Sequence, residues 1–559
     1  MQQDCRQCSA SFEITAADLE FYDKVSPIFH GKKELIPPPT LCPQCRQQRR
    51  SAWRNERSLH PRICSRCNRK IVAVYPADAP FPVYCHKCWW SEEWDPREFG
   101  VPLDLSRSFI EQCAELLNRV PHLAMMNDNG VNSENCEYTY DFSFGKNCYM
   151  VCGSWFIEDS YYCAAPNTRC KFIVDSYFLA ESEICYECLD SRRLYNCRYL
   201  QNCEGCTDCI FGYDLKGCSD CVGCFGLRQK RFHWFNESLS EEEYKARLAA
   251  FDRGSYRAIE QMKVRFRAVI TTLPRRGMQL VNCEDCTGDY LFGCHDVKDS
   301  YLIFDAEHCR YCDRGEGQKF SYDLLHTGFS QFCYEGLTPD NSYMTCFSMW
   351  CWYTKQLLYS DNCHHSEHLF GCASMKRSKF CILNKQYTEE EYMTLVPQII
   401  EQMRQRGEWG EPFPTDMSPF GYNETMAQDY FPLSRSEVET RGWTWREPQS
   451  DDINGTDASA LPDRIQDTSQ EILTSPIRCL RSGRVFRMIK QEVDFYKAHA
   501  IPLPRLHPTE RHKDRFNAHN PEKIWNRQCA KCSKDIQTTY PPDSSAKVYC
   551  ESCYLETVY

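Results

Sequence analysis

The sequence lacks the features of membrane and exported proteins. No apolar run approaches the roughly 20 residues that a membrane-spanning helix needs. The chain begins MQQDCRQC, without the basic and apolar segments of a signal peptide. We therefore expect a cytoplasmic protein that makes no membrane contact and keeps its thiols reduced.

Motifs of the common enzyme classes are also missing. The sequence contains no P-loop, no G-x-G-x-x-G, no G-x-S-x-G and no H-E-x-x-H. His364, His365 and His368 form the one local cluster of mixed ligand character, and nothing pairs a nucleophile with a base. We predict that the protein is not an enzyme; the alternative is a metal-dependent hydrolase or a thiol-redox enzyme.

Cysteine, by contrast, is abundant, with 39 residues in a chain of 559. Residues 1–90 contain four C-x2-C knuckles, and residues 476–559 repeat the same text with two knuckles left. For example, "RICSRCNRK" returns as "RQCAKCSKD", and "VYCHKC" returns as "VYCESC". The repeat has lost three cysteines together: Cys8, Cys42 and Cys45 have become Ser482, His507 and Glu510.

The cysteines that are lost together belong to one metal site, and those that are retained belong to another. Any other grouping would leave half of a broken site in the repeat. Two knuckles supply the four thiolates of a closed tetrahedral zinc site, and the spacing fits zinc ribbons. We therefore predict about three zinc ions; disulfides, the alternative, suit secreted chains. The predicted ligand sets are Cys5, Cys8, Cys42 and Cys45; Cys64, Cys67, Cys85 and Cys88; and Cys529, Cys532, Cys550 and Cys553.

The repeat also retains the remnant of a fourth site. Cys479, His507 and Glu510 could still hold zinc with one open position, as catalytic zinc sites do. The alternative, which we favour, is a decayed site stabilised by the packing of the aromatic residues around it.

These residues carry a resemblance to known families. The Cys5–Arg46 segment resembles the probable-zinc-ribbon family of bacteria, with C-x2-C, F-x-(I/F)-T, (E/D)-x-(F/E)-(F/Y)-Y and P-x-x-C-P-x-C-R. Most of the chain resembles an uncharacterised cysteine-rich family of candidate-phyla bacteria with reduced genomes, through "GCSDCVGCFGLRQK", "ILNKQYTEEEY", "GEWGEPFP", "SPFGYNETMAQDYFPL" and "RGWTW". The resemblance implies zinc ribbons and no known activity. The ribbon pattern needs four cysteines, and the 476–515 segment departs from it.

Charge is distributed unevenly along the chain. Residues 1–90 and 476–559 each carry a net charge of +6, whereas the middle carries −23. Basic ends on an acidic body favour an anionic partner. Arginines with an aromatic residue among them suit phosphate contact and base stacking; the alternatives are a solvated surface around zinc and a protein partner. The predicted nucleic-acid residues are Arg46, Arg49, Arg50, Trp53, Arg54, Arg57, Arg62, Arg66 and Arg69.

The middle of the chain, 130–385, is repetitive. An Asp-Ser-Tyr phrase begins at 159, 175 and 299, and an Asn-Cys phrase at 135, 147 and 196 puts cysteine in the serine position. A position that accepts both residues requires a small side chain rather than a metal ligand. The recurrence predicts a β-solenoid with Cys and Ser inside and glycine at its corners. The alternatives are iron–sulfur clusters within 203–224, or extra zinc at Cys185/Cys188 and Cys283/Cys286.

The solenoid is doubled, because the text from Cys224 matches the text from Cys372 at an offset of 148 residues. Capping boxes at 240–243 and 388–391 predict a helix after each half. We predict a mainly β, multi-domain chain, with zinc ribbons at both termini flanking a cysteine-lined β-solenoid. The predicted boundaries are zinc ribbon A at 1–54, zinc ribbon B at 55–95, a helical linker at 96–129, solenoid half 1 at 130–235, a helical insert at 236–277, solenoid half 2 at 278–385, a helix and aromatic, proline-rich arm at 386–446, a flexible acidic linker at 447–475, degenerate ribbon A′ at 476–515 and ribbon B′ at 516–559.

Together these features predict a non-enzymatic zinc-binding scaffold. Its basic ribbons would contact nucleic acid or a ribonucleoprotein, and the solenoid would act as a spacer or as a docking surface for a protein. The alternative is a protein-assembly scaffold in which zinc is purely structural.

Overall fold

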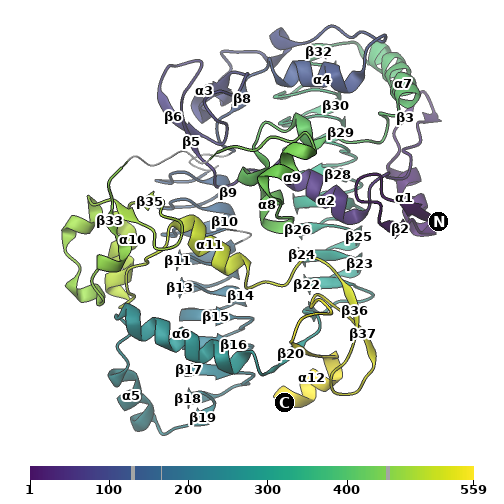
Figure 1. Ribbon diagram of the computed structural model, residues 1–559. Coiled ribbons are helices and arrows are strands. Elements are labelled where there is room, and N and C mark those ends of the chain that lie inside the picture. The colour runs from purple at the N-terminus through teal and green to yellow at the C-terminus, as the bar shows by residue number, and fades with distance from the viewer. Residues whose placement is uncertain (127–131, 165–166, 448–452) are drawn as a thin grey trace.

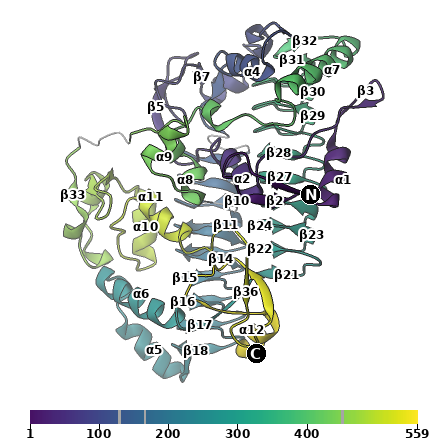
Figure 2. The same ribbon diagram turned by 45° about the vertical axis from the view of Figure 1, so that its right-hand side comes forward.

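Two stacks of short parallel strands form the centre of the molecule (Figure 1). The computed structural model describes residues 1–126, 132–164, 167–447 and 453–559. We call residues 132–238 stack 1 and residues 280–386 stack 2. The stacks lie side by side and run in opposite directions. In Figure 1 the strands from β9 to β19 follow one another downward, whereas those from β22 to β32 follow one another upward, and Figure 2 shows the same relation.

Each stack is built from coils of 12 residues. Partners in neighbouring parallel strands are mostly 12 positions apart, as in Cys185–Cys197 and Gly288–Ser300. Within a coil, every third residue has a positive φ, for example 49° at Asn196, 56° at Tyr199 and 56° at Asn202. A residue in this left-handed region turns the chain, so the coil changes direction at every third position.

The residue after each turn points into the stack. In stack 1 these interior residues include cysteines interspersed with Leu, Ile and Val, and they are almost fully buried. Cys148 Sγ donates to the carbonyl of Lys146 at 3.3 Å, and Ser160 Oγ donates to the carbonyl of Glu158 at 2.7 Å. Cys and Ser therefore make the same bond, to the carbonyl two residues back, and the predicted small interior position is confirmed.

The prediction of glycine at the corners is confirmed in part. Gly226, Gly293 and Gly371 do turn with positive φ, but most corners hold other residues, above all Asn, Asp and aromatics. Asn and Asp tolerate the left-handed region better than other L-residues. Gly145 and Gly212 lie at interior positions, where Phe142 and Leu215 side chains leave no space for a Cβ.

Cys148→Ser is expected to lower the free energy of unfolding by less than about 1.5 kcal/mol, because the hydroxyl can keep the bond to Lys146 and the volume change is small. Cys148→Leu is the matched control, and overpacking should cost about 1–3 kcal/mol. Urea unfolding of both variants measures the difference. Loss of bound metal from Cys148→Ser would contradict the small-residue interpretation.

The strands of the two stacks follow the coils, and each stack ends in an antiparallel strand before a helix. Stack 1 contains β9 (Tyr140–Ser143), β10 (Cys152–Glu158), β11 (Asn167–Val174), β12 (Tyr177–Ala180), β13 (Glu183–Tyr186), β14 (Leu189–Arg192), β15 (Tyr195–Gln201), β16 (Thr207–Tyr213), β17 (Ser219–Phe225), β18 (Arg231–Trp234) and β19 (Glu237–Ser238). Stack 2 contains β21 (Leu280–Val281), β22 (Gly288–Phe292), β23 (His295–Lys298), β24 (Ser300–Phe304), β25 (Glu307–Arg310), β26 (Asp313–Glu316), β27 (Tyr322–Gly328), β28 (Tyr334–Leu337), β29 (Lys355–Leu358), β30 (Glu367–Phe370), β31 (Lys379–Ile382) and β32 (Lys385–Gln386).

Helices follow both stacks, as the capping boxes predicted. Ser240 with Glu243, and Thr388 with Glu391, each form the reciprocal capping bonds. The helices are α5 (Glu241–Ala250) and α6 (Tyr256–Ile270) after stack 1, and α7 (Glu389–Arg406) after stack 2.

The terminal segments fold as small modules, which we call modules A (1–54), B (55–95), A′ (476–515) and B′ (516–559). Module A contains β1 (Gln2–Asp4), β2 (Ser11–Glu13), α1 (Ala16–Val25), β3 (Ile28–Phe29), β4 (Lys32–Lys33) and α2 (Pro43–Ser51), and module B contains β5 (His60–Ile63), β6 (Lys70–Ala73), β7 (Val83–Tyr84) and α3 (His86–Trp90). Module A′ contains β34 (Ile477–Arg478), β35 (Val485–Phe486), α10 (Lys490–Ala498) and most of α11 (Pro508–Phe516), and module B′ contains β36 (Trp525–Gln528), β37 (Asp535–Thr538), β38 (Lys547–Tyr549) and α12 (Glu551–Val558).

The connecting segments differ in part from the prediction. The predicted helical linker is helical only in short pieces, and the aromatic arm is irregular as expected. These segments hold η1 (Pro96–Phe99), α4 (Phe109–Leu117), β8 (His122–Leu123), β20 (Pro274–Arg276), η2 (Thr415–Met417), η3 (Tyr422–Glu424), α8 (Met426–Tyr430) and α9 (Arg435–Thr440). In the described parts of the chain, none of the helices is long and apolar enough to cross a membrane.

The prediction of a flexible linker is wrong for residues 453–475. This segment forms β33 (Thr456–Asp457), η4 (Ala458–Ala460), η5 (Ile465–Asp467) and η6 (Gln470–Leu473), and its few apolar side chains are buried against module A′. Arg505 donates to the carbonyls of Ala458 and Leu461, which fixes the segment although its composition is polar. Residues 448–452 of the predicted linker lie outside the described residues.

Candidate metal centres

The structure brings together each predicted set of four cysteines. In each set, the four Sγ atoms all lie within 4.8 Å of one another, so each set could hold a metal ion. The second knuckle of each set begins a helix, since Cys42, Cys85 and Cys550 are the N-cap residues of α2, α3 and α12. The grouping inferred from the lost ligands is therefore confirmed.

The spacing of the thiols fits a tetrahedral centre. Zn–S bonds of about 2.3 Å place neighbouring sulfur atoms of a tetrahedron about 3.8 Å apart. The Sγ–Sγ distance is 3.8 Å from Cys8 to Cys42, and 3.9 Å from Cys67 to Cys85. In module B′, the distance from Cys532 to Cys550 is 3.8 Å. The donor set and its size thus suit a metal that prefers four thiolates.

An arginine supports the thiolates of module B. Arg69 donates from Nε to Cys67 Sγ at 3.3 Å and from Nη2 to Cys85 Sγ at 3.4 Å. The hydrogen bond from Arg69 lowers the pKa of Cys67 to about 6, so this thiol ionises readily. Such bonds from outside the ligand set orient the ligands and favour the thiolate form that a metal requires.

The remnant site of module A′ does not assemble. Cys479, His507 and Glu510 are not among the groups of the described residues whose ligand atoms lie within 4.8 Å. His507 instead caps α11, where its Nδ1 accepts from the amide of Thr509 at 3.1 Å. Glu510 pairs with Lys513 at 3.1 Å. The three side chains thus form no group with metal-ligand spacing among the described residues, and the decay of this site stays a prediction.

The other candidate ligands of the middle have ordinary structural places. Cys185 and Cys188 are buried inside stack 1, and in the described part of the chain the middle cysteines form no further group with metal-ligand spacing. His364 is buried beside Trp352, whereas His365 stacks on Tyr353. The alternatives of iron–sulfur clusters and extra zinc thus lack a ligand set here.

The predicted nucleic-acid surface is wrong for its first five residues. Arg46, Arg49, Arg50, Trp53 and Arg54 are all buried, with at most 7% of each residue exposed. Charge density in the sequence did not show which way these side chains point. Their positive charges meet carboxylates of the same chain, so they are not available to phosphates in this fold.

Helix α2 lies on stack 2 (Figure 1), and its arginines meet two buried acids there. Arg46 Nε and Arg50 Nη1 each lie 2.9 Å from Asp323 Oδ1. Arg49 Nη2 lies 2.6 Å from Glu335 Oε1, and Arg50 also reaches Glu335 at 2.9 Å. Burial alone would lower the pKa of Arg46, but the charge of Asp323 raises it overall, so Arg46 stays charged.

The remaining residues of the arginine run lie nearer the surface and have partners of their own. Arg57 pairs with Asp429, and Arg62 donates to backbone carbonyls of module B. Arg66 pairs with Glu93 at 3.2 Å, and Arg69 contacts the thiols already described. A nucleic-acid contact of these four residues stays a prediction.

Helix α11 repeats this docking on stack 1. Arg511 and Arg515 both pair with Asp175, Arg515 at 3.0 Å. The two arginines follow their counterparts in α2 by 465 residues, and Asp175 precedes Asp323 by 148 residues, the offset of the internal repeat. Both duplications therefore preserve one contact. The sequence prediction missed these acids, although matching offsets of the acids and arginines could have revealed them.

The modules hold the two stacks together across the molecule. Module B pairs β7 with β8, which leads into stack 1, but its Trp89 packs on His364 of stack 2. Module B′ pairs β38 with β20, which leads into stack 2, but Tyr554 of its α12 donates to Asp214 of stack 1 at 2.6 Å. Each pair of modules thus joins one stack to the other.

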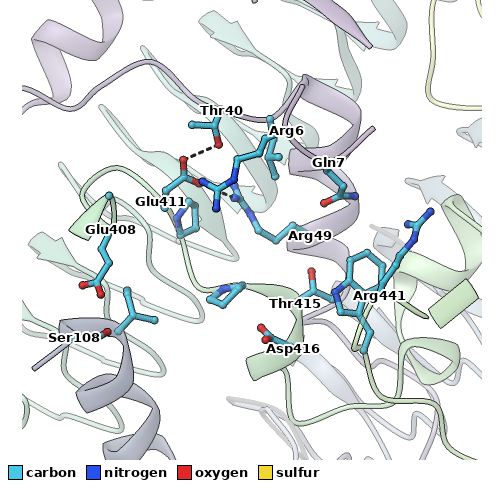
Figure 3. Close-up of a pocket in the computed structure, with 16 residues that line it drawn as sticks. Arg6, Gln7, Thr40, Arg49, Ser108, Glu408, Glu411, Thr415, Asp416 and Arg441 are labelled. Atoms are coloured by element: carbon cyan, nitrogen blue, oxygen red, sulfur yellow. Dashed lines mark hydrogen bonds and ion pairs between the residues drawn. The ribbon is translucent and has the colours of Figure 1, made fainter. Parts of the chain in front are cut away.

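A surface groove of about 480 Å³ lies beside the first cysteine set (Figure 3). Gln7 and Leu41 of module A border it, together with residues of the arm 407–443. Thr40 Oγ1 donates to Glu411 at 2.7 Å across one wall. The 16 lining residues include charges of both signs but neither histidine nor cysteine. The lining therefore lacks the histidine that most often serves as a general base.

Comparisons with known proteins add little. No family model matches the chain, and no curated protein matches it. Among solved structures, one named as an acetyltransferase from Desulfovibrio desulfuricans G20 is 9% identical over 38% of this chain, with a TM-score of 0.10. The match spans 65% of that protein's length. A likeness this small carries no argument about fold or activity.

Proposed function

We propose that the protein is a non-enzymatic, zinc-stabilised scaffold for protein assembly. In this proposal, the two stacks are the halves of a β-solenoid, and the terminal modules are zinc ribbons that clamp the halves together. The observation that carries it is the docking of modules A and A′: their arginines point inward to Asp323 and Asp175, so the modules serve the architecture first.

Zinc is the metal that the ligand sets favour. Four thiolates at tetrahedral spacing are typical of structural zinc, which leaves no position open for a substrate. Side chains fill the interior of the stacks, which favours a structural role for the stacks over a role as a channel or cavity.

A protein partner suits the outer surface better than a nucleic acid. Phe144, Phe156, Phe329 and Tyr353 are turn residues with positive φ, and 43%, 52%, 56% and 56% of each is exposed. Exposed aromatic side chains on a rigid support are typical of protein interfaces. Of the arginine run that would have favoured phosphate contact, Arg46, Arg49, Arg50 and Arg54 are buried.

Elemental analysis of the purified full chain tests the metal. We expect three zinc ions per chain, one for each set in the structure. Abundant iron, or four ions or more, would contradict the proposed ligand sets. A titration with RNA and DNA at low salt tests the partner class: strong, salt-dependent binding would contradict a protein-assembly role, because phosphate contacts release counterions.

A further inference from the structure

The equivalent helices α2 and α11 begin in different ways. Helix α2 starts at Cys42, whose side chain belongs to the first cysteine set and makes no side-chain cap of the kind seen in α11. Helix α11 starts at His507, whose imidazole accepts a hydrogen bond from Thr509. A cap of this kind satisfies one of the free amide groups of the first turn. The side chain at the start of α11 therefore belongs to no cysteine set, whereas the side chain at the start of α2 is a member of one.

Charged residues at and near the former ligand positions of module A′ form ion pairs with their neighbours. Glu510 pairs with Lys513, and the neighbouring Arg481 pairs with Asp514 at 2.6 Å. The docked arginines of α11 reach Asp175 without any metal ligand set beside them. Docking of this helix on an acidic residue of a stack therefore does not in itself require a metal.

Module A differs because four thiols surround the start of α2. Cys42 and Cys45 belong to the helix, and Cys5 and Cys8 lie in the loop opposite. Without a metal, four sulfur atoms within 4.8 Å either repel one another as thiolates or stay as weakly bonded thiols. Cys8 is exposed, so this ligand set can be reached from solvent.

We propose that the first cysteine set is a metal-dependent latch: bound zinc holds α2 on stack 2, and loss of this zinc releases α2 while α11 stays docked on stack 1. The proposal rests on the proposed structural role of zinc. Release would turn the arginines of α2 from buried partners of Asp323 and Glu335 into a solvent-exposed basic segment. The chain thus carries one conditional and one permanent copy of the same contact.

Hydrogen exchange of the full-length, zinc-loaded protein tests the latch, with zinc counted at each step of a chelator titration. Amide exchange in residues 43–54 should become at least about tenfold faster when zinc leaves the first set. Exchange in residues 508–516 should stay unchanged, so α11 is a control within the same molecule. Exchange in the interior strands of both stacks reports whether the whole chain still folds.

A variant assigns the effect to one site. Cys8→Ser removes the exposed ligand and should speed exchange in 43–54 while two zinc ions remain. The matched control is Ser482→Ala, at the equivalent position of module A′, which should leave 508–516 protected. Should Cys8→Ser express poorly, the chelator titration of the natural chain still decides.

The outcomes separate the latch from the proposed function. If the natural chain binds three zinc ions, and their removal loosens α2 and α11 equally or loosens neither helix, the latch alone is overturned. A natural chain that carries no zinc and still protects α2 would overturn both, because docking would then need no metal.

Discussion

Cys85→Ser is expected to unfold module B and to leave both coil stacks folded. Structural zinc in small modules contributes roughly 10–16 kcal/mol of apparent binding free energy, so such modules unfold without it. Cys85 is a predicted metal ligand and the N-cap residue of α3, and its backbone amide donates to Cys64 Sγ at 3.3 Å. One substitution therefore removes a ligand and loosens the helix that it begins.

Zinc analysis and limited proteolysis measure this effect. The zinc content should fall by one ion, and cleavage should appear within residues 55–95 but not within the stacks. Cys550→Ser, the equivalent change in module B′, should give the same pattern at the other end of the chain. A full zinc content in Cys85→Ser would mean that the second set is not a closed four-thiolate site.

Asp323→Ala is expected to lower the free energy of unfolding by about 3–5 kcal/mol, because it removes one partner of a buried ion-pair network and leaves Glu335 as the remaining carboxylate for Arg46 and Arg50. Arg46 and Arg50 would lose their shared acceptor while 2% and 5% of their side chains are exposed. Denaturant unfolding of the full chain, followed by tryptophan fluorescence, measures the change.

The duplication supplies a twin for this experiment. Asp175→Ala removes the acceptor of Arg511 and Arg515 and should cost a similar amount, although no metal set stands beside that contact. Asp416→Ala, at an exposed carboxylate of the groove, should change the stability by less than about 0.5 kcal/mol. An Asp323→Ala variant as stable as this control would show that the arginines are solvated in solution.

The sequence was most informative where it repeats with changes. Comparison of two copies identified the ligand sets, because ligands of one site are lost together, and it identified Cys148 and Ser160 as equivalent interior residues. The 12-residue coil was harder to see. Cys203, Cys206 and Cys209 follow its three-residue step, but this spacing also begins the ferredoxin motif. The coil follows from backbone turns at Asn, Asp and aromatic residues, which have no single sequence signature.

The direction of the arginines could not be predicted from composition. The net charge of +6 on residues 1–90 has the same value whether its partner is a phosphate or a carboxylate of the same chain. Long-range pairs such as Arg46–Asp323 depend on how the stacks lie side by side, which local sequence does not encode. The same reasoning explains why the segment 453–475 is ordered although it contains few apolar residues. Leu461 and Ile465 are buried because module A′ covers them.

Module A is synthesised before the stack on which it docks, whereas module A′ is synthesised after its stack. Arg46 emerges 277 residues before Asp323, its partner. At roughly 5–20 residues per second, this gap lasts about 14–55 s. Arg511, in contrast, emerges 336 residues after Asp175, onto a surface that is already made. The first module must therefore persist alone on the ribosome, whereas the last can fold directly against its partner. We therefore expect bound metal to contribute most to the stability of module A, which is synthesised long before its partner.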